Sequence, residues 1–313
     1  MMFVILGIDG LSSNLLQQEL ANVPHIASLL ALSAYSYMAR ADVPAISSIN
    51  WGTHFFGHGA AYHCWVNNEK AFACSGAQSI FDVIPNSTGY GAWDSLHRHI
   101  PAFHTTSSDS VTADRIALHV KNRDRNLVAG IFNAVDDANH MSKSQAHALQ
   151  HVDACVGNIM EHITPSDYVL LVSDHGPRDC KWWQWTCHDH YGMHKSEIET
   201  PMLLKGPGVA PGPITRRVTH QDTSYYVLNA LNYSIPCDWK LGEHTSCVTS
   251  WPGKTSHVAT AEENLRVAVD TAIWVAVPVF VFLLIIASLP WCCRNEQHPW
   301  CCRNEQHTFW PLN

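Results

Sequence analysis

Residues 3–9 read Phe-Val-Ile-Leu-Gly-Ile-Asp, a short apolar run that ends on an acidic residue. Two later runs, at residues 127–135 and 168–173, have the same form and precede Asp136 and Asp174. Short runs rich in valine, isoleucine and leucine are typical of buried parallel strands. Because ligands gather at the carboxyl ends of strands in an open α/β sheet, the three aspartates are expected to converge at one edge.

Histidines follow two of these aspartates closely. His140 lies four residues after Asp136, and His175 directly follows Asp174. Carboxylates and imidazoles gathered at one sheet edge predict a site for divalent metal ions. The 21 histidines among 313 residues point the same way. The chain is therefore predicted to be an enzyme.

The alternation of strand and helix patterns predicts an α/β fold with a central, mostly parallel sheet flanked by helices. Residues 142–163 carry apolar side chains at helical spacing, and this helix would link the second acidic strand to the third in a βαβ unit. Residues 202–205 predict a further strand, and residues 218–231 predict a final helix.

Composition divides the chain into four expected parts: a catalytic domain at 1–239, a polar stalk at 240–270, a transmembrane helix at 271–289 and a tail at 290–313. The third part (TAIWVAVPVFVFLLIIASL) carries no charge, and its length is close to the ~20 residues that cross a bilayer as a helix. A buried core helix is the alternative. The tail repeats Trp-Cys-Cys-Arg-Asn-Glu-Gln-His, which palmitoylation, metal binding or a duplication without function would each explain.

The charge and the cysteine content limit which partners the protein could bind and in which compartment the catalytic domain could lie. The net charge of −8 offers no basic surface, so no nucleic-acid binding is expected. Asn86-Ser-Thr and Asn232-Tyr-Ser are glycosylation sequons, and six cysteines have a spacing that permits local disulfides, with Cys155 left over. Arg294 and Arg303 follow the apolar segment, which favours an extracellular or luminal catalytic domain. A tail-anchored cytosolic domain is the alternative, because no signal peptide precedes the first strand.

The sequence also contains a candidate nucleophile. In Val43-Pro-Ala-Ile-Ser-Ser-Ile-Asn, the serines Ser47 and Ser48 stand just before a predicted helix start. The N–H groups at a helix N-terminus suit a phosphate, and a hydroxyl beside a divalent cation is activated for attack. Asn50 is predicted to donate a hydrogen bond to a phosphate oxygen. Helix capping by serine is the structural alternative.

In chain order, these elements resemble the alkaline phosphatase superfamily, and within it the type I phosphodiesterase/nucleotide pyrophosphatase group. The shared pieces are Ile8-Asp-Gly, the serine block, Asp136-Asp-Ala-Asn-His, Ser173-Asp-His-Gly, a later histidine and Thr200-Pro-Met-Leu-Leu-Lys-Gly. The resemblance covers nearly all of the region before the stalk. The serine block lacks the Cys/Ser-x-Pro-x-Arg pattern of sulfatases, so a sulfatase is disfavoured.

The resemblance implies two divalent ions, expected to be zinc. The implied ligands are Asp136, His140 and a late histidine for one ion, and Asp9, Asp174, His175 and the nucleophile oxygen for the other. Asp137 is not expected to be a ligand, because adjacent residues at a strand end point to opposite sides.

Two assignments within this set keep alternatives. Ser47 is the expected nucleophile because it lies three positions before Asn50, and Ser48 is the alternative. His190 is the expected late histidine, from its spacing to the Thr-Pro-Met-Leu segment, and His188 and His194 are the alternatives.

The function implied is a hydrolase that cleaves phosphodiester or pyrophosphate bonds, with a nucleotide or a lipid head group as the substrate. The Ser47 hydroxyl would attack phosphorus and form a phosphoseryl intermediate, which water then hydrolyses. A phosphomonoesterase or a phosphoethanolamine transferase is the alternative enzyme. The alternative of another class is a non-catalytic membrane glycoprotein that retains the fold.

Overall fold

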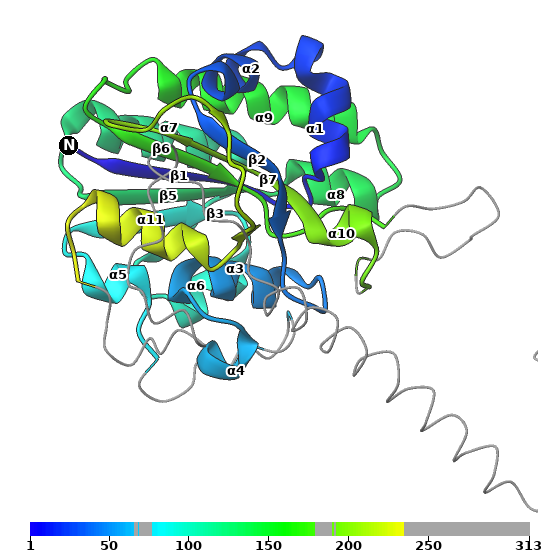
Figure 1. Ribbon diagram of the computed structural model, residues 1–313, viewed down its shortest axis with the longest axis horizontal. Helices are drawn as coiled ribbons and strands as arrows, with labels where there is room; N and C mark the ends of the chain where they lie inside the picture. The colour runs from blue at the N-terminus through cyan, green and yellow to red at the C-terminus, as the bar shows by residue number, and fades with distance from the viewer. Residues whose placement is uncertain (66–67, 69–76, 179–189, 191, 235–313) are drawn as a thin grey trace, which may run out of the picture. The chain divides into compact units, whose positions relative to one another are not determined.

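The computed structural model describes residues 1–65, 68, 77–178, 190 and 192–234. In this part of the chain, one nine-stranded sheet lies between two layers of helices (Figure 1). The strands are β1 (Phe3–Ile8), β2 (Ala34–Arg40), β3 (Ser87–Gly91), β4 (Phe103–Thr105), β5 (Leu127–Phe132), β6 (Tyr168–Val172), β7 (Glu199–Lys205), β8 (Gly212–Pro213) and β9 (Val218–Thr219). Their order is β4-β3-β5-β1-β6-β7-β2-β8, with β9 paired to β2.

The sheet is mostly parallel, as the sequence predicts. Strands β4, β3, β5, β1 and β6 are successively parallel. Strand β7 runs antiparallel to both of its neighbours, β6 and β2. It follows that β2 runs in the same direction as β1, although the two strands are not adjacent.

Helices cover both faces of the sheet (Figure 1). One face packs against α1 (Ser13–Glu19), α2 (Pro24–Ala31), α7 (Asp109–Asn122) and α9 (Gln145–Met160). The other packs against α3 (Ser47–Phe56), α5 (Ile80–Val83), α6 (Asp94–His99) and α11 (Asp222–Ala230). The remaining short helices are η1 (Leu20–Asn22), α4 (Ala60–His63), α8 (Ala134–His140) and α10 (Lys195–Ile198).

Central strands carry side chains into both cores, which explains their continuous apolar runs. All six residues of β1 are buried. Phe3 and Ile5 belong to one core, whereas Val4 and Leu6 belong to the other. This alternation is the geometry of a pleated strand covered on both faces.

One edge of the sheet collects the chain segments that carry the candidate residues. Strands β1, β2, β5 and β6 all end there, because they run in the same direction. The antiparallel strand β7 begins at the same edge. Segments that are distant in sequence are therefore brought together where these strands end or start.

The expectation that the second acidic strand runs up to Asp136 was wrong. Strand β5 ends at Phe132, and helix α8 begins at Ala134. The carboxylate of Asp109 accepts hydrogen bonds from the N–H groups of Asn133 (2.9 Å) and Ala134 (3.0 Å). This contact satisfies backbone donors at the start of α8, so the apolar residues there form a helix instead of extending the strand.

The expected final helix at 218–231 also starts later than predicted. Val218 and Thr219 form β9 beside β2, and α11 begins at Asp222. The Asp222 carboxylate accepts a hydrogen bond from the N–H of Thr219 at 2.7 Å, which stabilises the turn between strand and helix.

The expected stalk, transmembrane helix and tail, at 240–270, 271–289 and 290–313, lie outside the described residues and stay predictions. Within the described ranges, no helix has the length and apolar composition needed to cross a bilayer. Cys155 is a free, buried thiol, and Cys64 is disulfide-bonded.

Candidate active site

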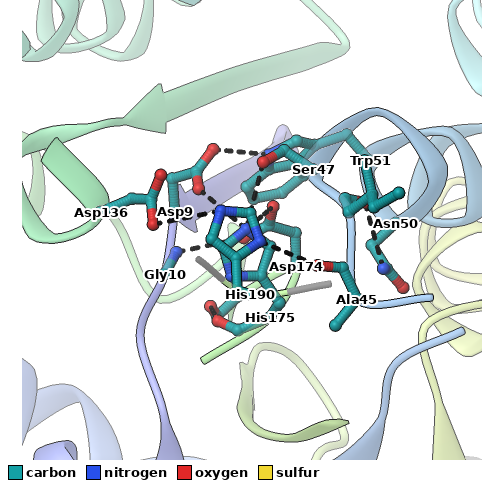
Figure 2. Close-up of polar contacts among 12 residues, drawn as sticks. Asp9, Gly10, Ala45, Ser47, Asn50, Trp51, Asp136, Asp174, His175 and His190 are labelled. Carbon is teal, nitrogen blue, oxygen red and sulfur yellow. Dashed lines mark hydrogen bonds and ion pairs between the residues drawn. The ribbon is translucent and has the colours of Figure 1, made fainter. Parts of the chain in front are cut away.

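Two clusters of carboxylates and imidazoles adjoin at the sheet edge (Figure 2). The first consists of Asp136, His140 and His190, and the second consists of Asp9, Asp174 and His175. Within each cluster, one potential ligand atom from each residue lies within 4.8 Å of the others. The rings of His175 and His190, one from each cluster, stack with their centroids 3.6 Å apart.

Helix α8 builds most of the first cluster. Asp136 and His140 are one turn apart on this helix, and the His140 Nε2 atom lies 3.1 Å from Asp136 Oδ2. The His190 Nε2 atom is 3.6 Å from Asp136 Oδ1. The other ring nitrogen of His190, Nδ1, donates a hydrogen bond to the carbonyl oxygen of Ala45 at 2.8 Å. This contact fixes the tautomer that turns the Nε2 lone pair toward the cluster.

Strands β1 and β6 build the second cluster. The N–H of Gly10 donates a hydrogen bond to Asp174 Oδ1 at 3.2 Å, and the indole of Trp51 donates one to Asp9 Oδ2 at 3.0 Å. The His175 Nε2 atom lies 3.2 Å from Asp174 Oδ2 and 3.5 Å from Asp9 Oδ1.

Each of the three aspartates keeps one oxygen that none of the described residues satisfies. Asp9 Oδ1, Asp136 Oδ1 and Asp174 Oδ2 are buried and have no hydrogen-bond partner among the described residues. A buried polar atom without a partner is rare and costly. Divalent cations would satisfy these oxygens, and carboxylate oxygens with imidazole nitrogens form a donor set that suits zinc. The residues present therefore fit the implied ions.

Burial and mutual repulsion explain the electrostatics of the site. Burial, helped by the charges of Asp174 and Asp136, raises the pKa of Asp9 well above its usual range. Burial and the charge of Asp136 likewise raise the pKa of Asp174. Burial also lowers the pKa of His175 to about 3, so its imidazole is neutral at physiological pH. A neutral imidazole is the form that binds a metal, and a bound cation would stabilise both carboxylates in their charged form.

Asp136 differs from the other two aspartates in this respect. Burial on its own would raise its pKa, but the hydrogen bond with His140 and the neighbouring imidazoles of His175 and His190 lower the pKa overall.

A glycine allows the clusters to approach each other. Gly10 has a φ of +74°, and a Cβ at this position would lie 2.8 Å from the Cβ of Asp136. Any larger residue would therefore push α8 away from the end of β1. This close approach gives the glycine in Ile8-Asp-Gly a structural reason.

The candidate nucleophile lies beside the second cluster. Ser47 is the first residue of α3, and its Oγ is 3.1 Å from His175 Nε2 (Figure 2). The expectation that both serines precede the helix was wrong. Ile46 is the N-cap, with no side-chain hydrogen bond, so neither serine caps α3. Ser48 Oγ is buried without a partner in the described part of the chain. Of the two serines, the geometry favours Ser47.

The structure does not bring the Asn50 amide to either cluster. Its Oδ1 accepts hydrogen bonds from the N–H of Asp42 at 2.7 Å and from His220 Nδ1 at 3.1 Å. Its Nδ2 donates to the carbonyl oxygens of Asp42 and Ile46 at 3.3 and 3.2 Å. The predicted contact with phosphate is therefore not supported. A buried amide needs hydrogen-bond partners for its donors and its acceptor, and backbone groups of the loop that leads into α3 provide most of them.

Geometry also separates the candidates for the late histidine. His190 is buried within the first cluster. His194 is exposed, and its Nε2 is 3.4 Å from a guanidinium nitrogen of Arg178. His188 lies outside the described residues. Asp137 is exposed and belongs to neither cluster, because helical neighbours point in different directions; the strand-end reason given for excluding it was wrong.

Sequence analysis missed a buried histidine pair behind the site. The rings of His54 and His220 stack with their centroids 4.1 Å apart. His54 Nε2 lies 3.2 Å from the carbonyl oxygen of Ser173, and His220 Nε2 lies 2.9 Å from the Thr200 hydroxyl. Burial lowers the pKa of His54 to about 3 and the pKa of His220 well below its usual range. The two neutral rings tie α3 to β6 and β7. No local pattern marks them, because their partners are distant in sequence.

Two further residues hold the loops around the site. The buried carboxylate of Glu197 accepts hydrogen bonds from the N–H groups of Gly192 (3.1 Å) and His194 (2.8 Å), just after His190. The Oδ1 of Asn68 accepts a hydrogen bond from the N–H of Ser48 at 3.0 Å, at the N-terminus of α3. A glutamate spaced seven residues after His190 was visible in the sequence, whereas nothing distinguished Asn68.

Residues 54–186 match the family model described as type I phosphodiesterase / nucleotide pyrophosphatase. Over this range, which is less than half of the chain, the protein is similar to that family. The resemblance inferred from the sequence is therefore confirmed. The matched range contains four residues of the two clusters, Asp136, His140, Asp174 and His175.

Individual proteins are also similar to parts of this chain. A phosphopentomutase from Methylobacterium sp. (strain 4-46) is 34% identical over 91 residues, which are 29% of this chain and 20% of the relative. The chain thus spans about a fifth of the length of the curated relatives it matches. Murine ectonucleotide pyrophosphatase/phosphodiesterase 5 superposes with a TM-score of 0.61 at 13% identity, covering 75% of this chain and 96% of that chain. An inactive variant of the murine protein in complex with AMP superposes with a TM-score of 0.60 at 14% identity, with the same coverage. The structural likenesses show a shared fold.

Proposed function

We propose that this protein is a metal-dependent hydrolase that cleaves phosphodiester or pyrophosphate bonds through a phosphoseryl intermediate at a two-zinc site. One observation carries the proposal: the Ser47 hydroxyl lies 3.1 Å from His175, at the place where two adjoining ligand clusters meet. A nucleophile beside two cations is the arrangement that an in-line displacement at phosphorus requires.

In this mechanism, Ser47, the N-terminus of α3 and the two ions have separate roles. The two ions, when bound, supply the positive charge that stabilises the attacking and leaving oxygens. Ser47 Oγ attacks phosphorus, so that an O–P bond forms as the bond to the leaving group breaks, and the proton that Ser47 loses leaves with the departing alcohol or phosphate. The dipole of α3, a helix of ten residues that begins at Ser47, would favour the negative charge of the phosphoryl group at its N-terminus. Water then hydrolyses the phosphoserine and regenerates the hydroxyl.

A nucleotide is the proposed substrate. Support comes from the family model and from the murine relative, whose inactive variant is in complex with AMP. A lipid head group linked through a phosphodiester would present the same reacting atoms. Measuring turnover of a nucleotide and of a lipid phosphodiester side by side distinguishes the two substrate classes.

Metal content and a panel of esters test the proposal. The purified protein is expected to contain two zinc ions per chain and to cleave a nitrophenyl phosphodiester, such as nitrophenyl thymidine monophosphate, faster than nitrophenyl phosphate. Removing the ions with a chelator should abolish both activities, and adding zinc should restore them. Faster cleavage of the monoester would favour a phosphomonoesterase. Substoichiometric zinc with no turnover of either ester would indicate a non-catalytic glycoprotein.

We also propose that residues 271–289 anchor the protein as a single span, with the catalytic domain extracellular or luminal. Both sequon asparagines, Asn86 and Asn232, are exposed, which leaves room for glycans. After expression in eukaryotic cells, glycosidase treatment should increase the electrophoretic mobility, and Asn86→Gln and Asn232→Gln should each remove part of that shift. A membrane-bound protein without any shift would instead support the tail-anchored cytosolic arrangement.

A further inference from the structure

Asp9 uses its two carboxylate oxygens in different ways. Oδ2 accepts a hydrogen bond from the indole Nε1 of Trp51 at 3.0 Å (Figure 2). Oδ1 has no hydrogen-bond partner among the described residues and lies 3.5 Å from His175 Nε2. An indole N–H can donate a hydrogen bond but cannot accept one. The contact therefore holds Oδ2 against the helix and turns Oδ1 toward the second cluster.

The fold reserves space for this contact. Trp51 is fully buried, and a Cβ at Gly7 would lie 2.5 Å from Cη2 and 2.8 Å from Cζ3 of its ring. A glycine inside a buried strand weakens the strand and often marks a close approach by another group. Gly7 on β1 thus leaves room for the indole to reach the aspartate that follows two residues later.

The same helix carries the candidate nucleophile. Ser47 and Trp51 are separated by four residues on α3, so their side chains lie on one face of the helix. Ser47 reaches His175, and Trp51 reaches Asp9. Helix α3 therefore fixes the position of the nucleophile and the orientation of one carboxylate ligand in the second cluster.

We propose that Trp51 is a positioning residue that restricts Asp9 to binding an ion through Oδ1 alone. By doing so, it couples the geometry of the second ion to that of the nucleophile helix. This inference rests on the proposed two-ion site. Without the indole N–H, the Asp9 carboxylate would be free to rotate away from the cluster. Hydrogen-bond partners of metal ligands typically contribute about 10–100-fold to metal affinity.

The test compares Trp51→Phe with Trp65→Phe in the full-length protein. Trp65 is also buried, at 1% exposed, and it packs edge-on against Phe56. Its Nε1 has no hydrogen-bond partner in the described part of the chain. The control therefore replaces a buried indole with a phenyl ring, as Trp51→Phe does, but breaks no hydrogen bond. Zinc affinity is measured by competition with a chromogenic chelator, which resolves the two binding steps. Trp51→Phe is expected to lower the zinc affinity of one site by about 10–100-fold and to leave the affinity of the other site unchanged. Trp65→Phe should leave both ions unchanged.

A second variant separates the N–H from the packing of the ring. Placing benzothienylalanine at position 51 keeps the shape of the ring but replaces the N–H with sulfur, and it should weaken the same ion. If both variants bind zinc as tightly as the wild type, or if they weaken both ions equally, the inference is overturned while the proposed function stands. A wild-type protein that binds no zinc would overturn the two-ion site itself, and the inference with it.

Discussion

Ser47→Ala is expected to lower turnover of the phosphodiester substrate by at least about 1,000-fold while both ions remain bound. The substitution removes the oxygen that lies 3.1 Å from His175 Nε2. It leaves the six candidate ligand side chains intact. Steady-state kinetics with a nitrophenyl phosphodiester, together with zinc analysis of the same preparation, separates loss of the nucleophile from loss of the metal.

Ser48→Ala is the matched control for this experiment. Ser48 follows Ser47 on the same helix, and its hydroxyl is buried without a hydrogen-bond partner among the described residues. The control should therefore retain wild-type turnover. After acid quenching during turnover, a phosphorylated peptide should contain Ser47. Loss of activity in Ser48→Ala, with Ser47→Ala still active, would show that the nucleophile has been assigned one residue too early.

Asp174→Asn is expected to lose at least one of the two ions. Asp174 Oδ1 accepts a hydrogen bond from the N–H of Gly10 at 3.2 Å, and an asparagine carbonyl can keep this contact. The other atom, Oδ2, lies 3.2 Å from His175 Nε2 and has no hydrogen-bond partner in the described part of the chain. An amide nitrogen in its place cannot ligate a cation. Zinc content after dialysis should therefore fall from two ions per chain to one or fewer, and turnover should be lost.

In the absence of metal ions, Asp174→Asn is expected to be more stable than the wild type. Burial and the charge of Asp136 raise the pKa of Asp174, so this carboxyl group destabilises the folded, ion-free protein at pH values above the pKa of an unfolded aspartate, and asparagine removes that cost. Without ions, Asp174→Asn should melt at a higher temperature than the wild type. Asp137→Asn is the control, because Asp137 is exposed and outside both clusters, and it should retain both ions. Unchanged zinc stoichiometry in Asp174→Asn would contradict the site as described.

Much of the fold was predictable because its signals are local. Strands β1 and β6 are buried on both faces, so their residues are continuously apolar, and that pattern is visible without knowledge of any partner strand. Helix α9 shows its apolar face in the same way. Strands β2, β3 and β4 were not singled out. In β2 and β3, buried residues are mixed with partly exposed ones, and β4 has only three residues.

The boundaries depended on contacts that the sequence does not reveal. The end of β5 and the start of α8 are set by Asp109, which lies more than twenty residues earlier in the chain. Asn50 belonged to the right segment, but its amide is engaged by the loop before α3 and by His220. A side chain's residue type is local information, whereas the direction in which it points depends on the packing around it.

The sequence alone determined which residues follow the buried strands β1 and β6, because strands that are buried on both faces are apolar throughout. Together with the resemblance to the alkaline phosphatase superfamily, these residues predicted the six members of the two clusters, with His188 and His194 left as alternatives to His190. Only the tertiary structure decided which oxygen of each carboxylate faces its cluster. Contacts such as that of Trp51 with Asp9, 42 residues apart, fix those orientations. A hydrogen bond across the fold depends on how strands and helices pack, and the order of residues along the chain does not encode that packing in any local pattern.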